Sequence, residues 1–124
     1  PLKFPPEHPP IKSVLAMRAC CALENEQDTL YAFSHGMFKA YFTHGRDIDD
    51  SSVVADVANT LGIDGERLVD RASEQVVKDR LRANTEEAIA KGAFGSPTMI
   101  VNEDRLYFGN DQLPLVRQAL LSRA

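Results

Sequence analysis

The sequence predicts a mostly helical α/β fold in which a β-hairpin and a closing helix follow a helical region. Apolar residues recur at helical spacing between residues 13 and 91. After Gly95 this period is lost, and two short β-forming runs, 98–101 and 105–108, flank a polar turn. We therefore expect a proline-rich connection at 1–12, helices at 13–91 and a ββα segment at 92–124.

Composition restricts the classes of partner. The 124 residues suffice for one domain, and 44% of them are hydrophobic and 26% charged, as in ordinary globular proteins. A net charge of −4 argues against nucleic acid or an anionic membrane surface as the main partner. The chain has no apolar run near the roughly 20 residues needed to span a bilayer. We expect no nucleic-acid partner and no membrane partner.

The two cysteines, Cys20 and Cys21, are adjacent in the chain. Neighbouring residues on a helix point in different directions, and a disulfide between them would be strained, so both are interpreted as free thiols. Neither has a Cys-x-x-Cys partner, and we expect them to pack as small apolar residues. Free thiols favour a reducing, cytoplasmic setting.

Capping residues and glycines divide the middle of the chain into five expected helices, after a head with five prolines in ten residues. Ser13 is placed to cap the first helix, and Asp50 or Ser51 the third. The aromatic-rich segment 30–42 is expected in the core rather than at a substrate cleft. The apolar positions that define the first four helices are Val14, Met17 and Cys21; Leu30, Phe33, Met37, Phe38, Tyr41 and Phe42; Val53, Val54, Val57 and Leu61; and Leu68, Val69 and Ala72.

The last helix is expected at 111–120, with Leu113, Val116, Ala119 and Leu120 on its apolar side. Pro114 is tolerated where no intrahelical N–H is needed, in the first turn. If Asp111 is the N-cap, Pro114 is the third helical residue, whereas Asn110 as cap would forfeit one bond. The spacing favours Asp111.

The hairpin by itself is too small to be a stable sheet. The strand 98–101 is apolar on both faces apart from Thr98, which suits a strand with neighbours on either side. Parallel partner strands for it are not found in this sequence. We therefore expect the chain to be the C-terminal part of a larger domain.

The proline at the start of this strand indicates a thioredoxin-like arrangement at a thiol-binding edge. If the Ser96–Pro97 bond is cis, the main-chain groups of Ser96 point outward. A thiol peptide can then pair with them as a short extra strand. The alternative is an ordinary trans proline that begins an edge strand.

Four motifs support a comparison with a known enzyme family. They are Pro5-Pro6 leading to 15–19, the segment 81–88, the run from Gly92 to Thr98, and the run from Phe108 to Leu113. With these motifs the chain resembles bacterial 2-hydroxychromene-2-carboxylate isomerases and, less specifically, their kappa-class glutathione transferase and DsbA-like relatives. Gly-x-Pro-Thr alone is shared across thioredoxin-like proteins, but its combination with Gly-Asn-Asp is more specific.

The resemblance implies a thioredoxin-like fold, incomplete here, with an all-helical insertion domain at 13–91. It implies glutathione as cofactor, a small aromatic carboxylate as substrate, and a homodimer. The family isomerises a hydroxychromene carboxylate to the open-chain hydroxybenzylidene-pyruvate. Its reactive serine lies in a segment that would precede Pro1, so no catalytic residue is expected in this chain.

The resemblance leaves half of a glutathione site at Ser96, Pro97, Asn110 and Asp111. Ser96 would offer main-chain groups to the cysteinyl part of glutathione, although a small aliphatic residue is usual there. The helix start at Asn110 would meet the γ-glutamyl carboxylate, and Asp111 the ammonium. The alternative for Asp111 is a purely structural cap.

Three classes of function remain open. The first is a glutathione-dependent isomerase, with a kappa-class transferase as its near relative. The second is a DsbA-like thiol–disulfide oxidoreductase, which would need a Cys-x-x-Cys elsewhere. The third is a truncated copy without catalysis that binds a partner through an exposed strand edge. A metal site is not expected, because His35 and His44 have no third ligand at suitable spacing.

Overall fold

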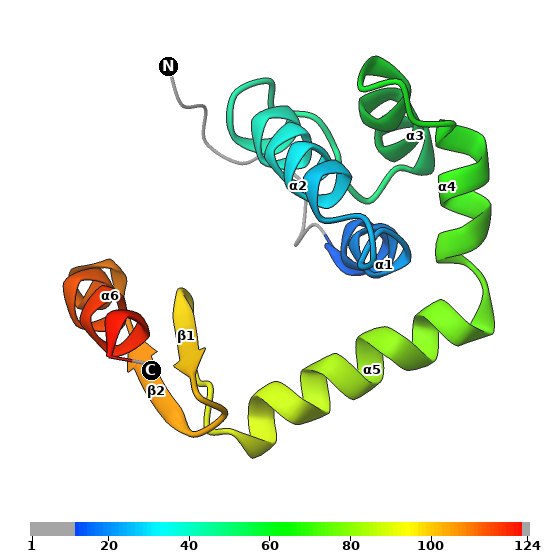
Figure 1. Cartoon of the computed structure of the whole chain (residues 1–124). Helices are drawn as coiled ribbons and strands as arrows, with labels where there is room; N and C mark the ends of the chain where they lie inside the picture. The colour runs from blue at the N-terminus through cyan, green and yellow to red at the C-terminus, as the bar shows by residue number, and fades with distance from the viewer. Residues whose placement is uncertain (1–11, 123–124) are drawn as a thin grey trace. The chain divides into compact units, whose positions relative to one another are not determined.

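The structure is a computed structural model, and it describes residues 12–122 (Figure 1). The proline-rich stretch before Lys12 lies outside the described residues. The chain forms two compact units, one up to Leu81 and one from Arg82. In order, the elements are α1 (Val14–Ala22), α2 (Gln27–Phe42), α3 (Ser51–Thr60), α4 (Gly65–Ala72), α5 (Gln75–Ala90), β1 (Thr98–Val101), β2 (Arg105–Phe108), the 3-10 turn η1 (Asn110–Gln112) and α6 (Leu113–Leu121).

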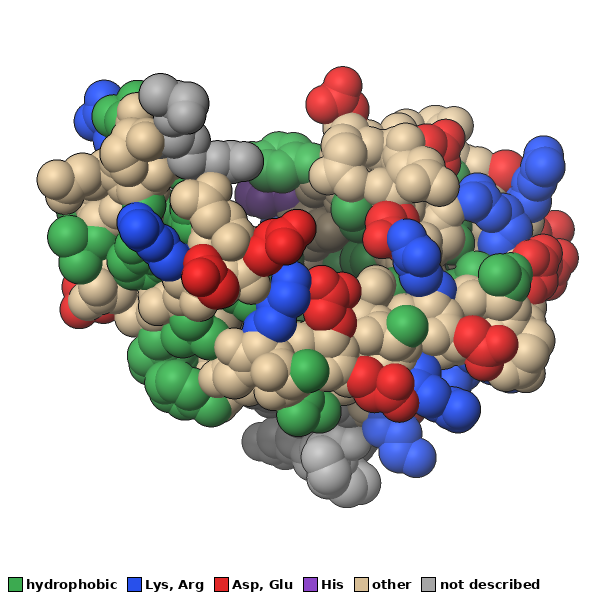
Figure 2. All heavy atoms as spheres, turned by 60° about the horizontal axis from the view of Figure 1, so that its bottom comes forward, with side chains coloured by type: hydrophobic (Ala, Val, Ile, Leu, Met, Phe, Trp, Pro, Cys, Tyr) green, Lys and Arg blue, Asp and Glu red, His purple; other side chains and the backbone are tan. Residues whose placement is uncertain are grey.

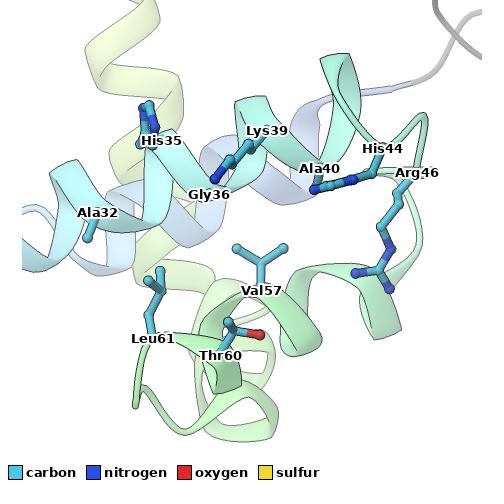
Figure 3. Close-up of a pocket in the computed structure, with 10 residues that line it drawn as sticks. All are labelled: Ala32, His35, Gly36, Lys39, Ala40, His44, Arg46, Val57, Thr60 and Leu61. Atoms are coloured by element: carbon cyan, nitrogen blue, oxygen red, sulfur yellow. The ribbon is translucent and has the colours of Figure 1, made fainter. Parts of the chain in front are cut away.

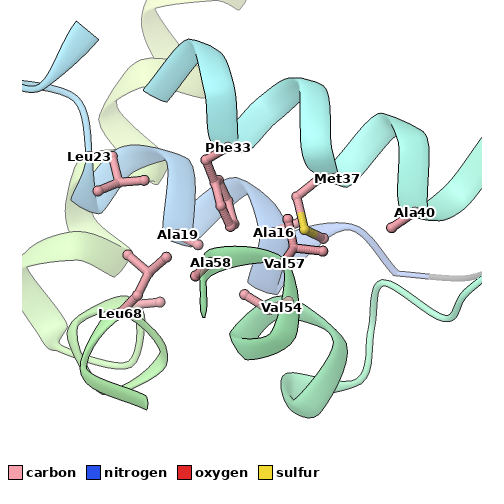
Figure 4. Close-up of a cluster of buried hydrophobic side chains, with 11 residues drawn as sticks. Ala16, Ala19, Leu23, Phe33, Met37, Ala40, Val54, Val57, Ala58 and Leu68 are labelled. Carbon is pink, nitrogen blue, oxygen red and sulfur yellow. The ribbon is translucent and has the colours of Figure 1, made fainter. Parts of the chain in front are cut away.

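The first unit is a helical cluster built around Phe33, which is fully buried. Figure 4 shows its ring reaching from α2 toward Ala19 of α1 and Ala58 of α3. Both alanines are fully buried, so their small side chains make room for the ring. The buried cluster consists of Ala16, Ala19, Leu23, Phe33, Met37, Ala40, Val54, Val57, Ala58, Leu68 and Ala72.

Helices α3 and α4 approach each other closely. A Cβ atom placed on Gly65 would lie 2.3 Å from the carbonyl oxygen of Ala55, so only glycine fits there. The N–H of Gly65 donates to the side-chain oxygen of Asn59 at 2.8 Å. Glycine and this amide therefore fix where α4 begins against α3.

The helix ends follow the sequence signals closely. Asp50 is the N-cap of α3, since its carboxylate accepts the Ser52 N–H at 2.8 Å. Hydrogen bonds from the Ser52 hydroxyl and N–H hold the pKa of the Asp50 carboxyl below its ordinary value. Gly62 and Gly92 follow α3 and α5 with φ of +78° and +86°. Ser13 occupies the expected position before α1, but its hydroxyl makes no capping bond.

Several expected core positions are exposed. Phe38 is 63% exposed and Phe42 41%, so placing the whole aromatic set of α2 in the core was wrong. The reason is helical geometry, because residues 37 and 38 point about 100° apart and Met37 takes the inward direction. The inward row is Phe33, Met37 and Ala40. Met17 and Leu61 are also more than 40% exposed.

The second unit contains the expected hairpin. β1 and β2 pair antiparallel with Thr98 opposite Phe108 and Val101 opposite Arg105. The turn between them places Asn102 and Glu103 at φ of +54° and +70°. Among the described residues of this unit, Val101 and Ala119 of α6 are buried, whereas Leu113 and Leu120, which were expected on the apolar side of the helix, are about half exposed.

The surface carries charges of both signs. Figure 2 shows basic and acidic side chains interspersed over the face that it draws. Among residues 12–122, the structure contains no helix of the length and apolarity needed to cross a membrane.

We expect Phe33→Ala to lower the free energy of unfolding by about 3–5 kcal/mol, because it leaves a cavity in the centre of the helical cluster. Phe38→Ala removes the same ring from the same helix at an exposed position and should cost less than about 1 kcal/mol. Urea denaturation of both variants measures the difference. Equal losses would contradict the assignment of Phe33 as the core residue of α2.

Candidate functional site

The hairpin brings the two halves of the expected site to one end of the sheet. Thr98 lies opposite Phe108, so the residues just before β1 and just after β2 are neighbours. The N–H of Gly109 donates to the carbonyl oxygen of Pro97 at 3.0 Å. Ser96 and Pro97 therefore lie beside the segment that carries Asn110 and Asp111, and all four residues are exposed.

The Ser96–Pro97 peptide bond is cis, as expected, which excludes the trans alternative. The hydroxyl of Thr98 donates to the carbonyl of Gly95 and closes the turn around this bond. Within the described residues, the N–H and C=O of Ser96 make no hydrogen bond. These main-chain groups are free to pair with a bound molecule.

Two glycines shape this end of the hairpin, and neither is among the residues predicted for the site. A Cβ atom on Gly95 would lie 2.7 Å from Cε2 of Phe108, whose ring centroid is 4.7 Å from that of Phe94 with the two planes tilted by 37°. Gly109 has φ of +96°, and a Cβ atom there would lie 2.6 Å from Oδ1 of Asp111. The sequence did contain a signal for both glycines, because each comes directly before a predicted pair of site residues: Gly95 before Ser96 and Pro97, and Gly109 before Asn110 and Asp111.

Asp111 is not the N-cap of the last helix, so that prediction was wrong. A 3-10 turn begins first, with Gly109 at the cap position and its carbonyl accepting the Gln112 N–H at 3.1 Å. Gln112 then precedes α6, and Pro114 falls in the first turn of that helix, where it costs no bond. Asp111 thus lies inside the turn instead of ahead of it.

Because Asp111 does not cap α6, its carboxylate is not used to bind the N–H groups of that helix. Among the described residues its carboxylate has one contact, a long one of 3.4 Å from the side-chain amide of Gln112. The N–H groups of Asn110 and Asp111 lie in the first turn, where no preceding carbonyl of the helix accepts them. Within the described part of the chain, the site therefore offers a carboxylate and two neighbouring N–H groups that donate to no backbone carbonyl.

The cysteines are remote in sequence from this site and lie on α1, where they are not joined in a disulfide. Cys20 is partly buried, and its Sγ lies 3.6 Å from the Ser34 hydroxyl. Burial raises the pKa of the Cys20 thiol, and the hydrogen bond to Ser34 offsets part of that rise. A raised pKa disfavours the nucleophilic thiolate. Over residues 12–122, the structure contains no group of three metal-binding side chains.

Comparison with known proteins places the chain in a family. It matches the DSBA-like thioredoxin domain over residues 1–121. The chain belongs to this DSBA-like family. The mostly helical fold with its small antiparallel sheet agrees with that assignment.

Relatives of this DSBA-like chain carry two kinds of name. It is 34% identical over 93 residues to glutathione S-transferase kappa 2 of Caenorhabditis elegans, covering 70% of this chain and 41% of that protein. It is 30% identical over 127 residues to glutathione S-transferase kappa 1 of Rattus norvegicus, covering 97% and 56%. It is 28% identical over 103 residues to 2-hydroxychromene-2-carboxylate isomerase of Sphingobium xenophagum, covering 82% and 52%.

These matches confirm the resemblance that the motifs predicted. They include both kappa-class transferases and hydroxychromene-carboxylate isomerases, so they do not separate the two activities. The chain spans about half the length of the relatives that it matches.

We expect Gly109→Ala to lower the free energy of unfolding by about 1 kcal/mol, since alanine is strained at φ of +96°. The new methyl group should also turn the Asp111 carboxylate away from its position. Gly62→Ala is the matched control, because Gly62 has φ of +78° and no atom within 4 Å of the added Cβ. The carboxyl carbon shift of Asp111, measured by NMR, should change in the first variant alone. An unchanged shift in Gly109→Ala would show that Gly109 does not position Asp111.

We expect Cys20 to react slowly with iodoacetamide at pH 8, because burial raises its thiol pKa. The measurement compares alkylation of a Cys21→Ser variant in buffer and in urea. Folded protein should react more slowly than unfolded protein at the same pH. Equal rates would argue against a buried, unreactive Cys20.

Proposed function

We propose that this chain forms part of a glutathione-dependent enzyme, and that Ser96, Pro97, Asn110 and Asp111 contribute half of its glutathione site. The observation that carries the proposal is the Gly109–Pro97 hydrogen bond of 3.0 Å. It brings the main-chain groups of Ser96, which make no hydrogen bond among residues 12–122, to the same end of the hairpin as Asp111. Relatives named as glutathione transferases support glutathione as the ligand.

Glutathione has chemical groups that match this arrangement. Its cysteinyl residue would pair with the N–H and C=O of Ser96 as a short extra strand. Its γ-glutamyl carboxylate would accept the N–H groups of Asn110 and Asp111, and the positive end of the helix dipole would favour it. Its ammonium would pair with the Asp111 carboxylate. The two charges of one zwitterion are thus met by two consecutive residues.

The reaction that we propose is the isomerisation of a 2-hydroxychromene-2-carboxylate or a similar small aromatic acid. Thiolate addition to a conjugated carbon–carbon double bond leaves a single bond that can rotate. Elimination of the same thiolate restores the double bond, so no oxidant or reductant is consumed. The role of the described residues is to hold and orient glutathione. We assign no residue of this chain to activation of the sulfur, and we propose a cytoplasmic homodimer as the whole enzyme.

A kappa-class glutathione transferase is the second candidate. The rat kappa 1 relative matches 97% of this chain, against 82% for the Sphingobium isomerase. Assays of the full-length protein with a hydroxychromene carboxylate and with an aryl halide separate the candidates. Turnover of the first without the second supports the isomerase, and the reverse result supports the transferase. With neither activity, a DsbA-like oxidoreductase or a copy without catalysis becomes the better description.

We expect Asp111→Ala in the full-length protein to weaken glutathione binding by about 1–3 kcal/mol, because the ammonium of glutathione loses its partner. Calorimetry measures the affinity. Asp104→Ala is the matched control, since it removes the same charge from the hairpin turn. The dipeptide Cys-Gly lacks the γ-glutamyl group and should bind both variants equally.

Unchanged glutathione affinity in Asp111→Ala would overturn the assignment of Asp111. An equal loss with Asp104→Ala would reduce the effect to net charge. Loss of Cys-Gly binding in Asp111→Ala would point to local damage in the hairpin instead of recognition of the γ-glutamyl end.

A further inference from the structure

A groove of about 380 Å³ lies between α2 and α3 in the helical unit (Figure 3). Its volume is within the range of about 300–1,000 Å³ that is usual for small-molecule sites. None of its residues belongs to the candidate glutathione site. It is lined by Ala32, His35, Gly36, Lys39, Ala40, His44, Arg46, Val57, Thr60 and Leu61.

Of the described residues, several with basic side chains line this groove and none with an acidic side chain does. Lys39 comes from α2, while His44 and Arg46 come from the connection to α3. Among the described residues Lys39 makes no ion pair. The guanidinium of Arg46 pairs with Asp56 through one nitrogen at 2.8 Å. An arginine side chain has five N–H donors, so the others can bind a ligand. On a chain of net charge −4, this groove is therefore lined by side chains of the opposite sign.

The floor of the groove is apolar. Val57 and Leu61 rise from α3 toward α2 in Figure 3. A Cβ atom on Gly36 would lie 2.8 Å from Cγ1 of Val57, so the two helices approach closely there and the floor is narrow. Leu61 is 42% exposed, which leaves apolar surface for a ligand to cover. The Thr60 hydroxyl donates to the Asp56 carbonyl at 2.8 Å, so the basic residues supply the remaining donors.

We propose that this groove binds a small organic carboxylate with an apolar body. The carboxylate would lie against Lys39 and Arg46, and the apolar body over Val57 and Leu61. A cation would be repelled by Lys39, and the Asp56 carboxylate beside the groove already pairs with Arg46. An inorganic anion would leave the apolar floor exposed, and a neutral hydrocarbon would leave Lys39 without a partner. The inference stands on these residues alone and does not depend on the proposed function.

The test is a titration of isotope-labelled full-length protein with 1-naphthoate, followed by NMR at low salt. We expect chemical-shift changes centred on residues 36–46 and 57–61. Naphthalene-1-carboxamide tests the need for charge, and inorganic phosphate tests the need for an apolar body. Both should bind at least about tenfold more weakly than 1-naphthoate, which is the size of effect that one such interaction has on a dissociation constant.

Two pairs of variants complete the test. Lys39→Gln should weaken naphthoate binding about tenfold, while Lys78→Gln on α5, the control with the same charge change, should leave it unchanged. Leu61→Gln should weaken naphthoate but not phosphate. The proposal is overturned by shifts that centre elsewhere, by equal losses in the two lysine variants, or by carboxamide or phosphate binding as tightly as naphthoate.

Discussion

The hydrogen bond from the Gly109 N–H to the Pro97 carbonyl is the interaction on which the candidate site depends. It extends the hairpin by one step beyond the Thr98–Phe108 pair. Without it, Ser96 and Asp111 would be two exposed residues in separate loops. With it, the turn that precedes β1 and the turn that follows β2 lie side by side at the same end of the hairpin. Gly109 can serve there because its backbone adopts φ of +96° and its missing side chain leaves room for Asp111.

The helical unit rests on a different constraint, which is the small size of residues at helix contacts. Ala19, Ala58 and Ala72 are fully buried. Gly36 and Gly65 occur where α2 and α4 each approach α3 within a distance that excludes a Cβ atom. Close approach of the backbones lets a few large side chains, Phe33 above all, fill the remaining space. The close approach at Gly36 also forms the floor of the groove between α2 and α3.

Most of the fold could be predicted from the sequence because its signals are local. The bounds of β1 and β2 follow from two four-residue runs around a polar turn, and Asp50 caps α3 as its side chain suggests. Asp111 was misplaced because the choice between a 3-10 turn and an α-helix depends on Gly109, whose conformation is set by the strand pairing. Phe38 and Phe42 were misplaced because the many aromatic residues of α2 were assigned to the core together, although their side chains point to different sides of the helix. The groove between α2 and α3 is lined by Lys39, Arg46 and Val57, which come from separate segments of the chain. The pattern within any one segment could therefore not indicate it.

The turn between the strands has a consequence for how the hairpin is encoded. Asn102 and Glu103 both adopt a left-handed backbone, which asparagine tolerates but which costs glutamate about 1–2 kcal/mol. The turn therefore does not favour its own conformation. The pairing of β1 with β2 and the packing of α6 against β1 offset the cost at Glu103, so the strands on either side stabilise the turn rather than the reverse.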